Sequence, residues 1–269
     1  MTFDAFFAAL WSDFVRLAPA AASIHDALVA AGETVVNDHI AFRTFNRGPI
    51  ALDKLEPHLL ALGYERGAPY LFEDKGLRAF GYTHPNPAAP LVFLSELLTE
   101  RLSVRAQADI DALIAQLPAD FVQGPQVFWS GRPWAAIDHA TYTRLQAESE
   151  YAAWTAAHGF HANHFTVRLN DLSESLRPVE SILAFVEARG FRVNASGGRV
   201  KGTPADLLEQ GSILADRMPV TFADGEQVIP TCYYEFALRH RQADGSLYAG
   251  FVAASADRIF ESTDARTAA

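Results

Sequence analysis

The sequence HFTVR at residues 164–168 and the sequence HIAFR at residues 39–43 share one pattern, in which a histidine and an arginine enclose alternating apolar and small residues. This alternation, with β-branched and aromatic residues at the apolar steps, is typical of a β-strand. Side chains two positions apart lie on the same face of a strand, so each histidine should point in the same direction as the arginine four positions later. A histidine and an arginine on one face are unsuited to a hydrophobic core, because burying them without partners is costly. The two strands therefore predict a functional site.

The similarity of the two stretches continues beyond the strands. Each is followed by a segment with helical periodicity that ends at a glycine with an aromatic residue after it: residues 52–62 before Gly63, and residues 179–189 before Gly190. A strand, a helix and an aromatic residue thus recur at nearly equal spacing, which predicts an internal duplication of a strand–helix–strand module. Two unrelated strand–helix units are the alternative.

The remaining pattern predicts an α+β fold with helices at its periphery. We expect one domain over residues 1–269, with module one at 33–97, a helical insertion at 98–159 and module two at 160–261. The other expected elements are helices at 3–17, 21–31, 104–117 and 140–157, and strands at 70–72, 77–82, 91–96, 218–222 and 231–239.

Composition limits the possible classes of protein. The 269 residues are 49% hydrophobic and 12% aromatic, enough for a substantial core, and the formal charge of −10 argues against nucleic acid or an anionic membrane as partner. No apolar run approaches the roughly 18 residues of a membrane span. The N-terminal residues lack the basic start of a secretion signal, and Cys232 is the only cysteine, which excludes a disulfide framework. We therefore expect a cytoplasmic protein.

The strand at residues 231–239 supplies a third candidate residue, Glu235. Alternation places Glu235 on one face with Tyr233 and Arg239, and burying its carboxylate among aromatic residues would be costly without a partner. A divalent metal ion is such a partner. Together, His39, His164 and Glu235 form a donor set that suits Fe(II), and also Zn or Mn. The alternative is that both histidines are hydrogen-bonded structural residues and that Glu235 pairs with an arginine.

Two other residues compete for a place in this site. His161 lies three positions before His164, and on a strand only one of the two can point inward; we choose His164 because it matches His39 in the repeat. Glu96 occupies a position in module one similar to that of Glu235 in module two. It either lies near the site or is an exposed charge at a strand end.

Three arginines, Arg43, Arg168 and Arg239, would add positive charge to the metal-bearing face, so we expect the site to receive an anion. Arginine is suited to bidentate capture of a carboxylate, and a dicarboxylic or 2-oxo acid fits a metal with an arginine beside it. Arg43 is the best candidate for the substrate contact and the expected catalytic arginine, and Arg168 is a second candidate for substrate binding. Arg168 and Arg239 are instead structural if they pair with local acids such as Asp171.

Several motifs of the chain resemble those of one known family. The motifs are NDHIAFR at 37–43, NHFT at 163–166, KG at 201–202, SILADR at 212–217 and YEF at 234–236. They are similar to the 2-oxoadipate dioxygenase/decarboxylase family, also called hydroxyglutarate synthases, in the vicinal oxygen chelate (glyoxalase-like) superfamily. The resemblance implies that the duplicated modules form a curved, partly closed mixed β-sheet.

The resemblance also implies a site and a reaction. Fe(II) would be held by His39, His164 and Glu235, and the substrate would be bound by Arg43, with Ser255 helping to hold its carboxylate. The substrates would be a 2-oxo dicarboxylic acid and O2, with 2-oxoadipate converted to 2-hydroxyglutarate and CO2 as a step of lysine catabolism. Two other interpretations keep the fold: a Zn- or Mn-dependent lyase, isomerase or hydrolase with Glu96 as general base, and a non-catalytic protein that binds metal or carboxylate.

Overall fold

The computed structural model describes residues 1–252 and 258–263, and this part of the chain contains ten strands. They are β1 (Asn37–Phe45), β2 (Glu65–Phe72), β3 (Leu77–Thr83), β4 (Leu91–Leu97), β5 (Ala162–Arg168), β6 (Lys201–Thr203), β7 (Leu208–Ser212), β8 (Arg217–Phe222), β9 (Gly225–Pro230) and β10 (Tyr233–Arg239). Eight of them form one mixed sheet in the order β2-β3-β4-β1-β5-β10-β7-β6, and β8 and β9 form a separate hairpin.

The order of strands in the large sheet repeats. In the first half β1 lies parallel to β4, followed outward by antiparallel β3 and β2; in the second half β5 lies parallel to β10, followed by antiparallel β7 and β6. The halves meet at the antiparallel pair of β1 and β5 in the centre of the sheet. This arrangement confirms the predicted α+β fold with duplicated modules and a curved mixed sheet.

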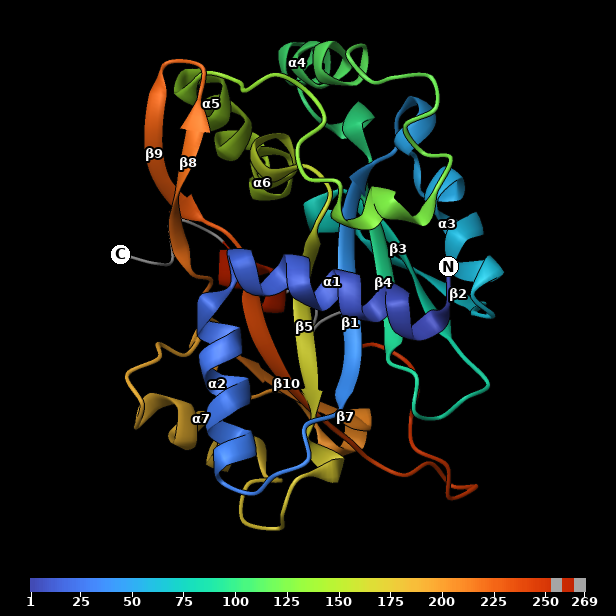
Figure 1. Cartoon of the computed structure of the whole chain (residues 1–269), viewed down its shortest axis with the longest axis vertical. Helices are drawn as coiled ribbons and strands as arrows, with labels where there is room; N and C mark the ends of the chain where they lie inside the picture. Colours follow the sequence, from blue (N-terminus) through green and yellow to red (C-terminus); the bar gives the residue numbers. More distant parts are fainter. Residues whose placement is uncertain (253–257, 264–269) are drawn as a thin grey trace.

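Seven α-helices surround the sheet in the described residues: α1 (Phe3–Leu17), α2 (Pro19–Ala30), α3 (Leu52–Ala61), α4 (Val104–Ile114), α5 (His139–Glu148), α6 (Glu150–His158) and α7 (Val179–Glu187). Helices α1 and α2 cross one face of the sheet, whereas α4, α5 and α6 lie at one end of it beside the β8–β9 hairpin (Figure 1). Each half of the sheet has its own helix, α3 or α7, between its first and second strands.

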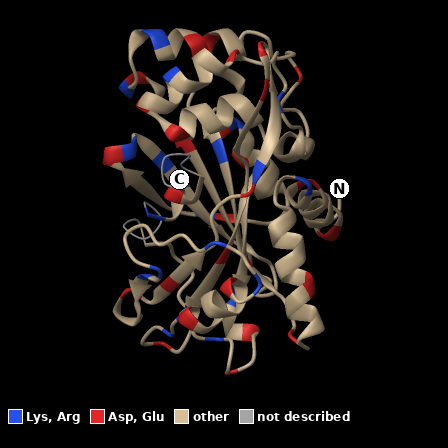
Figure 2. Cartoon of the chain, turned by 90° about the vertical axis from the view of Figure 1, so that its left-hand side faces the viewer, with Lys and Arg blue, Asp and Glu red and all other residues tan. Residues whose placement is uncertain are grey.

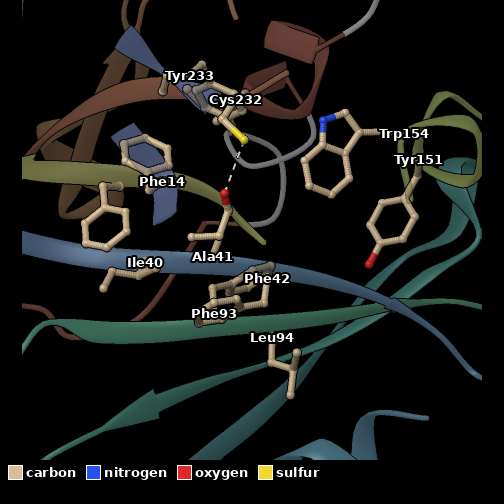
Figure 3. Close-up of a cluster of buried hydrophobic side chains, with 14 of the residues drawn as sticks. Phe14, Ile40, Ala41, Phe42, Phe93, Leu94, Tyr151, Trp154, Cys232 and Tyr233 are labelled. Atoms are coloured by element: carbon tan, nitrogen blue, oxygen red, sulfur yellow. Dashed lines mark hydrogen bonds between the residues drawn. The ribbon is translucent and has the colours of Figure 1, made fainter. Parts of the chain in front are cut away.

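Apolar side chains on one face of the central strands hold α1 in place. The ring of Phe165 lies 5.2 Å from that of Trp11 and 4.8 Å from that of Phe14, centroid to centroid, and Tyr234 on β10 packs against the same two helical residues. Figure 3 shows Phe14 at one side of this core and two aromatic residues of α6 at the other. Because Phe165 and Tyr234 face α1, their neighbours His164 and Glu235 point to the opposite face.

Two expected elements are different in the structure. The predicted single helix at 140–157 is wrong: Ser149 adopts an extended backbone and its hydroxyl accepts a hydrogen bond from the Ala152 amide, so that it ends α5 and caps α6. Strand β9 was not among the expected strands, because four of its six residues are exposed and its polar and apolar residues do not alternate.

The outer surface is charged. Acidic and basic residues are interspersed over the peripheral helices and loops in Figure 2, and a few lie on the strands inside. Within the described residues, no helix combines the length and apolar character that crossing a bilayer requires.

Candidate metal centre

Three adjacent strands bring the predicted metal ligands together on the face of the sheet opposite α1. His39 lies on β1, His164 on β5 and Glu235 on β10, and all three side chains are buried. The Nε2 atom of His39 lies 3.4 Å from Glu235 Oε1, that of His164 lies 3.3 Å from Oε2, and the two Nε2 atoms are 3.4 Å apart. One ligand atom from each residue falls within 4.8 Å of the others, so the group can hold a metal ion.

The polar atoms of this group do not fully satisfy one another by hydrogen bonds, and a cation would complete their interactions. Gln210 donates a hydrogen bond to Glu235 Oε1, but Oε2 is buried with no hydrogen-bond partner among the described residues. Burial raises the pKa of Glu235, which shows that a negative charge here lacks full compensation. A divalent ion would supply that compensation.

The histidines are suited to the same role. Burial, together with the charges of His39 and Arg43, lowers the pKa of His164 well below its usual value. The ring is therefore neutral and has a lone pair for a metal ion. Two imidazole nitrogens and one carboxylate oxygen are donors that Fe(II), Mn and Zn accept.

Irregular strand pairing brings further polar side chains to the site, and the sequence analysis missed it. Between Asn37 and Ile40 strand β1 contains one residue more than β5, and between Ala162 and His164 strand β5 contains one more than β1. Such β-bulges re-aim side chains and interrupt the alternation of faces. As a result, each histidine is hydrogen-bonded through Nδ1 to the residue before it.

Polar and apolar side chains surround the three candidate ligands. The hydroxyl of Thr166 lies 3.1 Å from His39 Nε2, and the ring of Tyr233 stacks on His164 with centroids 4.6 Å apart. The ring of Phe251, which the sequence analysis did not single out, lies nearly perpendicular to the ring of His39, with the centroids 5.0 Å apart. With Phe93 and Ile259 it forms the apolar lining of a small cavity at the three ligands. Apolar residues of this kind leave no signal in a search for polar motifs.

Arg43 is buried at the α6 end of this face. Its Nη1 donates to Glu150 Oε1 at 3.0 Å and its Nη2 donates to the Thr263 hydroxyl at 2.9 Å. The guanidinium carbon also lies 4.9 Å from the ring centre of Tyr151 and 5.1 Å from that of Trp154 (both rings are seen in Figure 3). This places a fixed, planar cation close enough to influence the pKa of His164.

The structure gives the other candidate arginines different partners. Arg168 is not brought to the metal ligands: it pairs with Asp171 and donates to the Pro87 carbonyl at 3.1 Å, as its structural alternative predicted. Strand alternation places Arg168 on the correct face, but at the end of the strand a local acid is closer. Arg239 pairs with Asp38, which in turn contacts His39. Ser255 lies outside the described residues.

Glu96 and His161 also have partners away from the three ligands. Glu96 accepts a hydrogen bond from Arg78 Nε at 2.8 Å and one from the amide of Leu52, at the start of α3, at 2.9 Å. A general base at Glu96 therefore has no support in this geometry. His161 contacts Asp13 on α1 at 2.6 Å, so that only His164 of the two histidines points to Glu235.

Comparison with known proteins identifies relatives along most of the chain. The family model described as 2-oxoadipate dioxygenase/decarboxylase matches residues 125–244. The curated 2-oxoadipate dioxygenase/decarboxylase, chloroplastic/amyloplastic, of Oryza sativa is 34% identical over 260 residues, which cover 86% of this chain and 70% of the rice protein. The chain belongs to the 2-oxoadipate dioxygenase/decarboxylase family.

Solved structures agree with membership of the 2-oxoadipate dioxygenase/decarboxylase family. The hydroxyglutarate synthase of Oryza sativa in complex with 2-oxoadipate is 30% identical, with a TM-score of 0.93 over 99% of this chain and 93% of that chain. A protein from Shewanella frigidimarina is 48% identical, with a TM-score of 0.88 over 93% of this chain and 98% of that one. A protein assigned to the glyoxalase superfamily, from Ralstonia eutropha, is 24% identical and shares the fold, with a TM-score of 0.73 over 92% of this chain and 84% of that chain.

Proposed function

We propose that this protein is a non-haem Fe(II) enzyme that converts 2-oxoadipate and O2 into 2-hydroxyglutarate and CO2. The observation that carries the proposal is the buried group of His39, His164 and Glu235 in a chain of the 2-oxoadipate dioxygenase/decarboxylase family. In this reaction the bond between C1 and C2 breaks, C1 leaves as CO2, C2 becomes a carboxylate, and the adjacent methylene carbon receives a hydroxyl. The two atoms of O2 balance the two new oxygen positions.

The three ligands would hold Fe(II) by two imidazole nitrogens and one carboxylate oxygen. With only three protein donors, the site would leave coordination positions for a 2-oxo acid and O2, and the bound Fe(II) would supply the redox chemistry. The protein contributes a rigid frame, because the ligands lie on three adjacent strands rather than on loops. Phe93, Phe251 and Ile259 make their surroundings apolar, which strengthens charge interactions at the centre.

Arg43 would bind the carboxylate of the substrate that does not reach the metal. Its guanidinium is buried and held against Tyr151 and Trp154, so little side-chain freedom remains to be lost when an anion binds. Glu150 and Thr263, which now accept its hydrogen bonds, show two positions at which a carboxylate oxygen could be received. A dicarboxylic 2-oxo acid would then bind with one end at the metal and the other at Arg43.

The proposal is tested by oxygen uptake of protein loaded anaerobically with Fe(II). Addition of 2-oxoadipate should start O2 consumption with matching formation of CO2 and 2-hydroxyglutarate, and pyruvate, which lacks a second carboxylate, should be a poor substrate. 2-Oxoglutarate serves as a comparison of shorter chain length. Protein that binds Fe(II) but consumes no O2 with any of the three acids would contradict the proposal.

A further inference from the structure

His39, Asp38 and Arg239 form a chain of hydrogen bonds beside the candidate metal centre. The Nδ1 atom of His39 lies 2.7 Å from Asp38 Oδ1. Arg239 donates two hydrogen bonds to the same carboxylate: Nε donates to Oδ2 and Nη2 donates to Oδ1, each at 2.7 Å. All three side chains are buried. The geometry is that of a bidentate arginine–carboxylate pair whose carboxylate also binds a histidine.

The Asp38–Arg239 ion pair joins two distant parts of the chain. Asp38 and Arg239 are 201 residues apart in the sequence, and Arg239 also donates to the carbonyls of Tyr248 and Gly250. A buried ion pair usually contributes little net stability compared with well-packed apolar residues, because both charges must lose their water. Stability alone therefore does not account for it.

The bulge in β1 explains how Asp38 reaches the ring of its neighbour. In a regular strand Asp38 and His39 would point to opposite faces, whereas the extra residue between Asn37 and Ile40 brings both toward the site. On β10, Arg239 lies four positions after Glu235 and on the same face. Strand β10 thus carries the candidate ligand Glu235 and also Arg239, which binds the carboxylate that contacts His39.

The carboxylate determines which nitrogen of His39 faces the metal. Both carboxylate oxygens of Asp38 accept hydrogen bonds from Arg239, and Oδ1 also lies 2.7 Å from Nδ1 of His39. A carboxylate held by a guanidinium accepts hydrogen bonds, so Nδ1 of His39 is the donor to Asp38. The other ring nitrogen, Nε2, lies 3.4 Å from Glu235 Oε1 and is the one left for a metal ion.

The second histidine is held differently. The Nδ1 atom of His164 lies 3.2 Å from the amide oxygen of Asn163, a neutral acceptor at a longer distance. A carboxylate behind a ligand histidine fixes its ring and increases its basicity more than an amide does. The two histidines are therefore unequal, although they occupy matching positions in the two halves of the fold.

We propose that Asp38 and Arg239 are positioning residues that make His39 the stronger of the two histidine ligands, by fixing its tautomer and its ring direction. The proposal rests on the proposed function only in that a metal ion binds at His39, His164 and Glu235. Arg239 also donates to the backbone carbonyls of residues 248 and 250, next to Phe251, whose ring packs perpendicular to that of His39. The ring of His39 is thus held by the hydrogen bond at Nδ1 and by the contact with Phe251.

The test is metal binding rather than turnover. Co(II) is added anaerobically to the metal-depleted full chain, and its affinity and visible absorption spectrum are recorded for wild type, Asp38→Asn, Arg239→Met and Arg239→Lys. We expect Asp38→Asn and Arg239→Met to bind Co(II) about 10- to 100-fold more weakly with an altered spectrum, and Arg239→Lys to restore part of the loss. Arg168→Met is the matched control, since Arg168 lines the same hollow as Arg239 and Asp38 but pairs with Asp171.

The double variant Asp38→Asn/Arg239→Gln removes both charges together, so that neither is left buried and unpaired if a single variant fails to fold. It too should bind Co(II) about 10- to 100-fold more weakly than wild type. Wild-type affinity and spectrum in the folded Asp38→Asn or double variant would overturn the proposal. Wild-type protein that binds no Co(II) would instead contradict the metal site itself.

Discussion

The variant Glu235→Gln distinguishes two possible roles of Glu235, metal ligand and structural acid, because they predict opposite changes in the free energy of unfolding. In the metal-depleted protein the Glu235 carboxylate is buried, one of its oxygens lacks a hydrogen-bond partner among the described residues, and its pKa is raised by burial. Glutamine has almost the same shape and no charge. Its amide oxygen can accept the bond from Gln210, and its amide nitrogen can donate toward the neutral imidazole of His164.

The expected gain in stability follows from the cost of burying the unpaired Glu235 oxygen. A buried polar group left without its partner costs about 1–3 kcal/mol, so metal-depleted Glu235→Gln should be more stable than metal-depleted wild type by about that amount. For a chain of this size about 1 kcal/mol changes the melting temperature by roughly 2 °C, which gives an increase of about 2–6 °C. Metal at 100 times its Kd should then stabilise wild type by about 2.7 kcal/mol, but should have little effect on the variant.

The assay is thermal and urea unfolding of both proteins after treatment with a chelator, repeated under anaerobic conditions with added Fe(II) or Mn(II). Glu235→Asp is a useful control, because it keeps the charge but shortens the reach to the histidines. Glu235→Gln that is less stable than wild type without metal, and that is stabilised by metal as strongly as wild type, would refute the assignment of Glu235 as a ligand.

The other predictions concern substrate binding, helix docking and pH. Arg43→Lys should keep the metal but raise the KM for 2-oxoadipate by about 10- to 100-fold, because a bidentate contact with a carboxylate is lost; oxygen-uptake kinetics measure this, and an unchanged KM would remove Arg43 from the substrate site. Asp13→Asn should lower the free energy of unfolding by about 1–3 kcal/mol, since Asp13 is buried against His161 and fixes α1 to the start of β5; urea unfolding checks it, with the exposed Arg16→Ala expected to change stability by less than about 1 kcal/mol. Burial lowers the pKa of His158 to about 3, so between pH 6.5 and pH 3 the unfolded chain binds a proton there that the folded protein does not. Stability that is present above pH 6.5 is therefore lost as the pH falls, by up to about 1.4 kcal/mol per pH unit; His158→Gln, which keeps a donor for the Pro230 carbonyl, should reduce this slope between pH 6 and pH 4.5, and an unchanged slope would contradict the role of His158.

The pattern of residues was sufficient to find the central strands β1, β5 and β10 and the three residues that the structure brings together as a possible metal site. The side chains of His39, His164 and Glu235 do lie together on one face, as the repeat and the alternation predicted. It failed where pairing is irregular. The bulges that bring Asp38 and Asn163 to the histidines depend on two strands at once, and neither strand shows them alone.

The choice among charged partners was also beyond sequence reasoning. Arg168 and Arg43 occupy equivalent places in the repeated motif, yet Arg168 pairs with Asp171 nearby, whereas Arg43 is enclosed by residues of α6. Which acid or ring lies closest depends on the packing of the helical segment between the two halves of the sheet. The break between α5 and α6 at Ser149, which the helical periodicity did not show, belongs to that same packing.

The most direct test of the central claim is a single-turnover reaction of Fe(II)-loaded protein with 2-oxoadipate under isotope-labelled O2. The account predicts 2-hydroxyglutarate that carries both labelled oxygen atoms, one in the new carboxylate and one in the hydroxyl, with unlabelled CO2 in equal amount. It also predicts that His164→Ala, which lacks one ligand, forms none. Unlabelled product from the wild-type protein, or labelled product from His164→Ala at the wild-type rate, would contradict it.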